Sequence, residues 1–292
     1  MWQVISDEKG TQAIVEGGRL EFLYPSIRTL QDVKRWRLYN RNKRYLLPKN
    51  KKYIPGAILL QAAESGSLPL IKRLLRNGIP VDSEDENGET ALSWVARWGS
   101  ASIVALLLAH GADPNHADKW GYTPLMIHFN ARNTRLLLQH GADPRALDED
   151  GDTALHCAAS TGSLDIVRLL LAAGAVHAAN NKGETPLHEA VYGWNESEKR
   201  IEIARLLLAT GADLNARTQE GRTPLICATR SGNPKTTAFL LAVGADPADK
   251  DYSGASALDV ARSQIGIRNT SIQMEQMYVE TVAVLEKAIG SK

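Results

Sequence analysis

The sequence predicts a mainly α-helical solenoid of about seven stacked helix–turn–helix units, preceded by a small α+β cap at the N-terminus. Two alternating patterns predict it. A Gly-x-Thr-x-Leu segment returns along the chain, and a leucine-rich segment that ends in Gly-Ala follows each copy. The helices implied by each pair are too short to be stable alone, so the units must stack and bury a shared core.

The spacing of the first pattern defines the period. The repeated glycines are Gly88, Gly121, Gly151, Gly183, Gly221 and a degenerate copy at Gly254, with spacings of 33, 30, 32, 38 and 33 residues. The threonine two residues later is a preferred helix N-cap, and the proline that often follows it suits the first helical position. Gly174 and its equivalents are expected to end the second helix in the left-handed conformation.

These segments resemble the ankyrin-repeat family, whose signature is Thr-Pro-Leu-His-x-Ala at a period of 33. The stretch 185–190, Thr-Pro-Leu-His-Glu-Ala, matches every fixed position, and 153–159 lacks only the proline. The resemblance implies β-hairpin loops between units, and histidines His156 and His188 that tie a helix start to a neighbouring hairpin. The implied repeats are approximately 53–84, 85–117, 118–147, 148–179, 180–217, 218–250 and 251–290.

Three repeats depart from the period. The unit at Gly121 is three residues short, and the unit at Gly183 is five residues longer, so that residues 194–199 should protrude between its helices. The last unit carries about eleven extra residues before a final helix expected near Val279–Ile289. Terminal repeats are expected to be atypical because they close the core.

Residues 1–52 lie outside the repeats and predict the cap. Three short apolar stretches, at residues 2–5, 12–15 and 20–24, have strand composition and are separated by turn residues. Thr29 then begins a capping-box pattern typical of a helix start. A segment of this size is marginal alone, so we expect it to dock on the first repeat.

Composition excludes several classes of protein. Hydrophobic residues are 43% of the chain and its net charge is +1, which is typical of a folded globular protein rather than a disordered one. No apolar run is long enough to span a bilayer and no signal-peptide pattern opens the sequence, so we expect a cytoplasmic protein, of the producing cell or of a target cell. Cys157 and Cys227 occupy equivalent positions two units apart, roughly 20 Å by helix packing, and are expected to be free thiols.

Catalytic motifs are missing from the sequence. It has no glycine-rich phosphate loop, no Cys/His cluster with metal-ligand spacing and no nucleophile elbow, so we expect no catalytic residues, no cofactor and no metal. An enzyme whose catalytic part is residues 1–52 is the least favoured alternative, because that segment is too short to enclose an ordinary active site.

One segment is strongly basic. Residues 34–52 hold nine of the 34 Lys and Arg residues and no acid. Its proposed binding patch is Lys34, Arg35, Arg37, Arg41, Lys43 and Arg44. With the interleaved aromatics, this patch could bind nucleic acid or an anionic surface. The alternatives are a solvated helix face that docks on the first repeat, or contact with an acidic protein.

The resemblance implies a non-catalytic module that binds another protein through hairpin tips and a concave inner-helix face. Such a module can act as a stoichiometric inhibitor, an immunity protein, a delivered effector or an adaptor, and we expect a monomer when it is free. Acidic tips at residues 82–86 and 148–152 either serve solvation or steer a basic partner. Scarce aromatics and two flanking cations predict the binding site within residues 86–194, because such side chains dominate interfaces. It comprises Trp94, Arg97, Trp98, Lys119, Trp120, Tyr122, Tyr192 and Trp194.

Overall fold

The computed structural model of the chain describes residues 3–6, 12–16, 19–22, 55–127, 130–192, 198–266 and 272–290. These residues divide into two compact units. The N-terminal unit comprises Met1–Val95 and Gly99–Asp113, and the C-terminal unit comprises Ala96–Trp98 and Pro114–Lys292. Each unit is described by itself.

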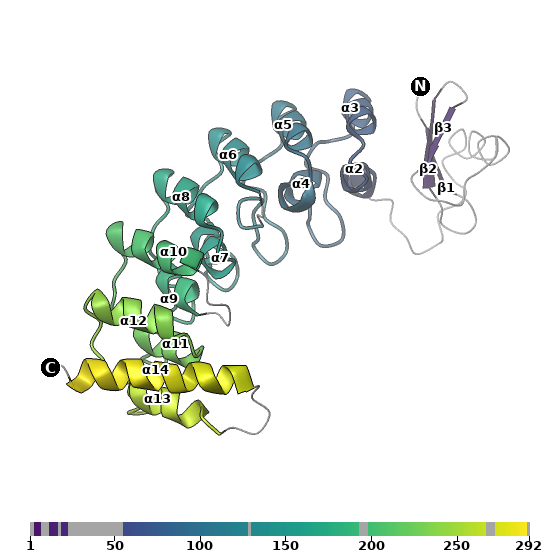
Figure 1. The fold of residues 1–292 in the computed structure, drawn as a ribbon. Helices are drawn as coiled ribbons and strands as arrows, with labels where there is room; N and C mark the ends of the chain where they lie inside the picture. The colour runs from purple at the N-terminus through teal and green to yellow at the C-terminus, as the bar shows by residue number, and fades with distance from the viewer. Residues whose placement is uncertain are drawn as a thin grey trace. The chain divides into compact units, whose positions relative to one another are not determined.

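The N-terminal unit begins with a three-stranded antiparallel sheet in the order β1-β2-β3 (Figure 1). Its strands are β1 (Gln3–Ser6), β2 (Gln12–Glu16) and β3 (Arg19–Phe22). Val4 pairs with Ile14, which in turn pairs with Glu21. The three predicted strands are thereby confirmed, whereas the helix expected from Thr29 and the basic segment 34–52 lie outside the described residues.

Two helical hairpins follow the sheet. They are formed by α2 (Pro55–Glu64) with α3 (Leu68–Arg76), and by α4 (Ala91–Trp98) with α5 (Ala101–Ala109). The last three residues of α4 cluster with the C-terminal unit. Within the N-terminal unit α3 packs on α2 and on α5, and Leu74 and Leu107 are buried.

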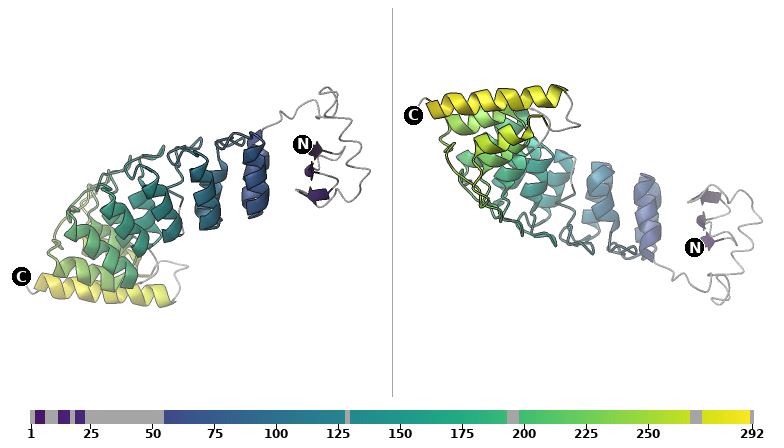
Figure 2. Two further views of the ribbon diagram at one scale, coloured as in Figure 1. Left: turned by 90° about the horizontal axis from the view of Figure 1, so that it is seen from above. Right: turned by 90° about the horizontal axis from the view of Figure 1, so that it is seen from below.

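The C-terminal unit contains nine of the described helices. They are α6 (Ala131–Gln139), α7 (Ala154–Ser160), α8 (Leu164–Ala172), α9 (Pro186–Val191), α10 (Glu198–Ala209), α11 (Pro224–Arg230), α12 (Pro234–Ala242), α13 (Ala257–Gln264) and α14 (Ile272–Gly290). Helices α7, α9, α11 and α13 form an inner layer, and α6, α8, α10, α12 and α14 form an outer layer (Figure 1). The long α14 lies across the end of this unit, against α12 and α13 (Figure 2).

Side-chain size explains the two layers. The inner helices bury alanines such as Ala158, Ala190 and Ala228, whose small side chains let neighbouring inner helices approach closely. Four of the outer helices, α6, α8, α10 and α12, each bury a leucine at the equivalent position of the repeat. These leucines are Leu137, Leu170, Leu207 and Leu240, and none of them is exposed. The leucines fill the space between the layers, so the core is continuous along the stack.

Helix starts are capped as predicted. Nδ1 of His156 accepts the backbone N–H of Thr153 (3.0 Å), and its Nε2–H donates to the carbonyl of Glu184 in the next unit (3.1 Å). His188 makes the equivalent bonds to Thr185 (3.1 Å) and to the carbonyl of Arg222 (3.2 Å). Both histidines therefore join consecutive units and confirm the structural role that the resemblance implies.

Three helix predictions were wrong. In the short unit Thr123 is followed by turns over residues 124–127 and not by a helix, because the missing residues leave too little chain to close one. Helix α10 begins at Glu198, so the end of the predicted protrusion is helical, and residues 193–197 lie outside the described part. The last helix begins at Ile272, seven residues before the predicted Val279.

Candidate protein-binding surface

The hairpin tips are held by a repeated side-chain anchor. Oδ1 of Asp118 accepts the backbone N–H groups of Trp120 and Tyr122, at 2.9 Å each. Asp148 binds the N–H groups of residues 150 and 152 in the same way, at 3.0 and 2.8 Å. Asp85, Asn180 and Asp251 repeat the arrangement. Asp85 and Asp148, expected to lie among the free acidic tips, are thus turn anchors, whereas Glu149 and Asp150 are exposed.

Successive hairpins are also bonded to each other. The N–H of Glu149 donates to the carbonyl of Trp120 (3.0 Å), and the N–H of Asn181 donates to the carbonyl of Asp150 (2.9 Å). Gly121 has a positive φ of 83°, and a Cβ there would lie 2.8 Å from the backbone of Asp148. A glycine is therefore required at this position both for its backbone conformation and for the close approach of the next hairpin.

The position after the capping histidine lies on the inner-helix face. Its first copy is Trp94, a predicted binding residue that is half-buried and not fully exposed. Cys157 and Glu189 are half-buried as well, and Cys227 is only 6% exposed. Burial raises the pKa of the Cys157 and Cys227 thiols to about 12, so both are poor nucleophiles at neutral pH.

Among these equivalent positions, Glu189 is the one that carries an acidic side chain. Burial is the main cause that raises the pKa of its carboxyl, and the nearby Glu184 and Asp152 raise it further. A hydrogen bond with the Ser160 side chain and the charge of Lys182 act in the opposite direction. Burying this carboxylate is costly in the free protein; Lys182 and Arg200, whose guanidinium also feels the Glu189 charge, offset part of that cost, and a further cation would offset the rest.

The guanidinium of Arg200 fixes the far end of the same inner helices. It donates to the carbonyl of Ser160 at the end of α7 (2.6 Å) and to those of Glu189, Ala190 and Tyr192 at the end of α9 (3.3–3.4 Å). These carbonyls have no partner inside their own helices, and a cation is favoured at a helix C-terminus. Arg200 therefore links the C-terminal ends of the adjacent inner helices α7 and α9.

The predicted aromatics are only partly exposed. Trp120 is 49% exposed at a hairpin tip and Tyr192 is 44% exposed at the end of α9. Tyr122 is half-buried, and burial followed by the charge of Asp148 raises the pKa of its phenol. Cys157 is among the groups that raise the pKa of Tyr122, and Glu189 is among those that raise the pKa of Cys157.

The other predicted site residues are more scattered. Trp94 belongs to the N-terminal unit, whereas Arg97 and the exposed Lys119 belong to the C-terminal unit. The side chains of Trp98 and Trp194, and the whole patch of Lys34, Arg35, Arg37, Arg41, Lys43 and Arg44, lie outside the described part of the structure.

Comparison with known proteins decides the family. The family description "Ankyrin repeats (3 copies)" matches residues 59–133, 127–218, 180–251 and 195–269, which together cover more than half of the chain. The chain belongs to the ankyrin-repeat family.

Individual relatives agree with this assignment. The ankyrin repeat protein YahD of Escherichia coli (strain K12) is 30% identical over 199 residues, which cover 66% of this chain and 98% of YahD. The human ASB11 ankyrin repeat domain superposes with a TM-score of 0.60 at 26% identity, covering 76% of this chain and 96% of that one. The ankyrin repeat domain of Bcl-3, an IkappaB family member, superposes with a TM-score of 0.59 at 29% identity, covering 75% of this chain and 96% of that one.

In this ankyrin-repeat protein three features beyond the predicted site residues bear on binding, and sequence analysis missed two of them, Glu189 and the pair Met274 and Met277. Glu189 occupies the variable position of the family signature, and that variability was the only available signal. Tyr252, at a later hairpin tip, is 73% exposed, with its ring beside the α-carbon of Gly221. Met274 and Met277 line a pocket under α14 that is described below.

The described residues carry few signs of other chemistry. The two cysteines are free, as predicted. Within the described ranges no three His, Cys, Asp or Glu side chains are grouped so as to hold a metal ion. The same residues include no helix with both the length and the hydrophobicity needed to cross a bilayer.

Proposed function

We propose that this ankyrin-repeat protein is a non-catalytic binding module whose C-terminal unit takes a basic segment of a partner protein on its inner-helix face. Ankyrin repeats are protein-interaction modules, and that part of the proposal follows from the family. The carrying observation is Glu189, a half-buried carboxylate whose pKa is raised by burial and by Glu184 and Asp152 despite the nearby cations Lys182 and Arg200. An Arg or Lys of the partner would pair with it.

The surroundings of Glu189 fit the same kind of partner. Glu149 and Asp150 are exposed at the neighbouring hairpin tip, where they would raise the association rate of a basic surface. The exposed rings of Trp120 and Tyr192 supply apolar area beside the charge. Binding here would cover the partner and so favours an inhibitor or adaptor role.

Copurification from the source cell tests this function. The tagged full chain, a Glu189→Lys variant and a Trp120→Ala variant would be purified side by side, and their bound proteins quantified by mass spectrometry. Arg168→Ala is the matched control, because Arg168 is 57% exposed on the outer helix α8. We expect one protein to be retained by wild type and control and lost from Glu189→Lys.

Affinity measurements then identify the surface. Trp120→Ala should weaken binding of the captured protein by about 2 kcal/mol, as interface tryptophans do. Binding should also weaken as salt rises from about 50 to 500 mM. A partner that binds Glu189→Lys and Trp120→Ala as tightly as wild type would place the interface elsewhere.

A further inference from the structure

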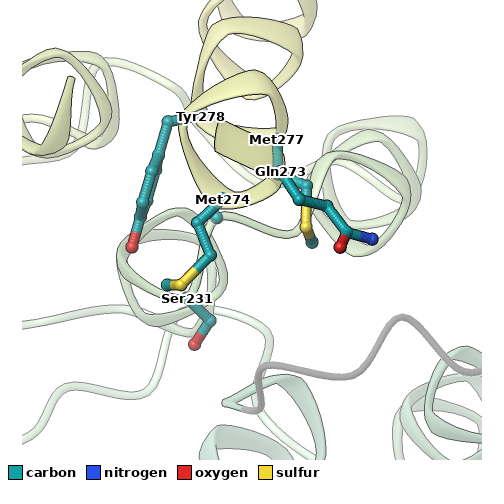
Figure 3. Close-up of a pocket in the computed structure, with 6 residues that line it drawn as sticks. Ser231, Gln273, Met274, Met277 and Tyr278 are labelled. Atoms are coloured by element: carbon teal, nitrogen blue, oxygen red, sulfur yellow. The ribbon is translucent and has the colours of Figure 1, made fainter. Parts of the chain in front are cut away.

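A pocket of about 210 Å³ lies under the first two turns of α14 (Figure 3). It is lined by Ser231 and Gly232, in the turn between α11 and α12, and by Gln273, Met274, Met277 and Tyr278 of α14. Figure 3 shows Met274 and Tyr278 directed from α14 toward Ser231. This hollow is here named the α14 pocket; Glu189 is not among the residues that line it, although Tyr192 of the inner-face site lies close enough to affect the pKa of Tyr278.

One wall of the α14 pocket is rigid and another is adaptable. The hydroxyl of the buried Tyr278 donates to the carbonyl of Arg230 (2.9 Å), and its ring lies so close to Gly232 that a Cβ there would be 2.9 Å away. Met274 and Met277 are half-buried and unbranched. Methionine adjusts to the shape of what it contacts and is frequent at interfaces.

The size of the α14 pocket limits its occupant. Small-molecule sites usually measure about 300–1,000 Å³, so a cavity of 210 Å³ suits a single side chain better than a cofactor. Ile272, next to it at the start of α14, is 86% exposed and extends the apolar surface outward. Such a hollow with an apolar margin fits one aliphatic or aromatic anchor of a polypeptide.

Charge around the pocket selects the flanking residues of that polypeptide. Arg230 is exposed and lies close enough to affect the pKa of Tyr278. Gln273 and Met274 belong to the first turn of α14, and a helix N-terminus favours negative charge. Glu275 is the acid in the first turn of α14, and it opposes this only in part.

We propose that the α14 pocket binds an acidic peptide segment of a partner, with one aliphatic or aromatic side chain in the pocket and a flanking carboxylate paired with Arg230. This second docking surface differs in charge preference from the inner face, which is proposed to take a basic segment. One partner with both kinds of segment, or two partners at once, could therefore be held by the C-terminal unit.

The four methionines of the chain make a direct test possible. Full-length protein labelled with ¹³C at the methionine methyl groups would be titrated with the blocked tripeptide acetyl-Glu-Leu-Glu-amide. We expect the Met274 and Met277 signals to move, with a Kd of roughly 1 mM, while the signal of the buried Met126 stays in place. The tripeptides with Lys in place of both Glu residues, or Ala in place of Leu, should bind at least about tenfold more weakly.

Two variants and a matched control locate the binding. Arg230→Glu changes an exposed residue and should abolish the shifts, and Met277→Glu should do the same by placing a carboxylate in the pocket. Gln276→Glu, on the exposed side of the same helix, should bind like wild type. Binding of the tripeptide should be unchanged in Glu189→Lys, so this proposal and the inner-face proposal can fail separately.

Several results would overturn the proposal. They are the absence of methyl shifts up to about 10 mM peptide, equal shifts with the Lys and Glu tripeptides, and undiminished binding to Arg230→Glu. A fourth overturning result would come from a variant in which residues 267–271 are replaced by Gly and Ser. If only that replacement admits the tripeptide, the occupant of the pocket is the protein's own chain and not a partner.

Discussion

Replacing Arg200 tests how the inner face is held together. Arg200→Met keeps most of the aliphatic stem and removes the guanidinium, which leaves the carbonyls at the ends of α7 and α9 to water. The 2.6 Å bond to Ser160 is charge-assisted, and such a bond contributes about 1.5–3 kcal/mol. The three contacts of 3.3–3.4 Å are longer and weaker, and water can reach part of the site. We therefore expect a loss of about 2 kcal/mol.

The loss should be local, because a repeat array gains its stability from neighbouring units. Hydrogen exchange followed by mass spectrometry would resolve it, and peptides covering α7 and α9 should open about 30-fold more often in the variant. Urea unfolding would measure the change in the free energy of unfolding of the whole protein. Arg168→Met is the control: Arg168 is exposed and its ion pair to Glu202 is 3.6 Å long, so the expected cost is under about 0.5 kcal/mol. Equal exchange of α7 and α9 in Arg200→Met and wild type would refute the capping role.

The elements fixed by local rules could be predicted from the sequence. Thr153 caps a helix, Leu170 fills the core and Gly174 ends a helix at a φ of 86°, and each of these follows from residue type and spacing alone. Because every unit repeats the same solution, an error at one position is corrected by its equivalents elsewhere. This is why the family and the two-layer packing were within reach of sequence reasoning.

Properties that depend on a neighbouring unit could not be predicted. The role of Arg200 requires knowing that the end of α7 lies beside it, 40 residues away in sequence. Thr123 shows the opposite failure, since its Thr-Pro-Leu start is a good local signal for a helix that does not form. Met126 occupies the position at which His156 and His188 cap the helix start in other units. Within the described residues the buried Thr123 hydroxyl lacks a hydrogen-bond partner.

The candidate surface was predictable only in outline. Trp120 and Tyr192 are exposed as expected, because hairpin tips and helix ends face solvent in any repeat array. The half-burial of Tyr122 and Glu189 depends on the repeats next to them, and no feature of one unit reveals how closely the next one packs. The difference matters for function, since burial is what raises the pKa of Glu189 above that of an ordinary surface carboxyl.

Three further measurements test the interactions between units. Gly221→Ala should cost about 1–2 kcal/mol in urea unfolding, because φ is 77° and the new Cβ would lie 2.5 Å from the Tyr252 ring; adding Tyr252→Ala should recover only the steric part. Glu189→Gln should raise the melting temperature at pH 7, because burial holds the folded-state pKa above 4.5; below about pH 4, where the carboxyl is protonated in both states, the gain should vanish. His156 and His188 act in the opposite sense. Burial lowers the pKa of both below the unfolded value of 6.5, so the unfolded chain takes up protons first as the pH falls. The stability contributed by the neutral rings is complete above pH 6.5 and declines from there toward the folded-state pKa. The urea midpoint should therefore drop more between pH 7.5 and 5.5 in wild type than in the His156→Gln, His188→Gln double variant, which has lost both titrations. An equal drop in the two proteins would show that these histidines are not buried in the neutral form and would remove the basis for their bonds to the next hairpin.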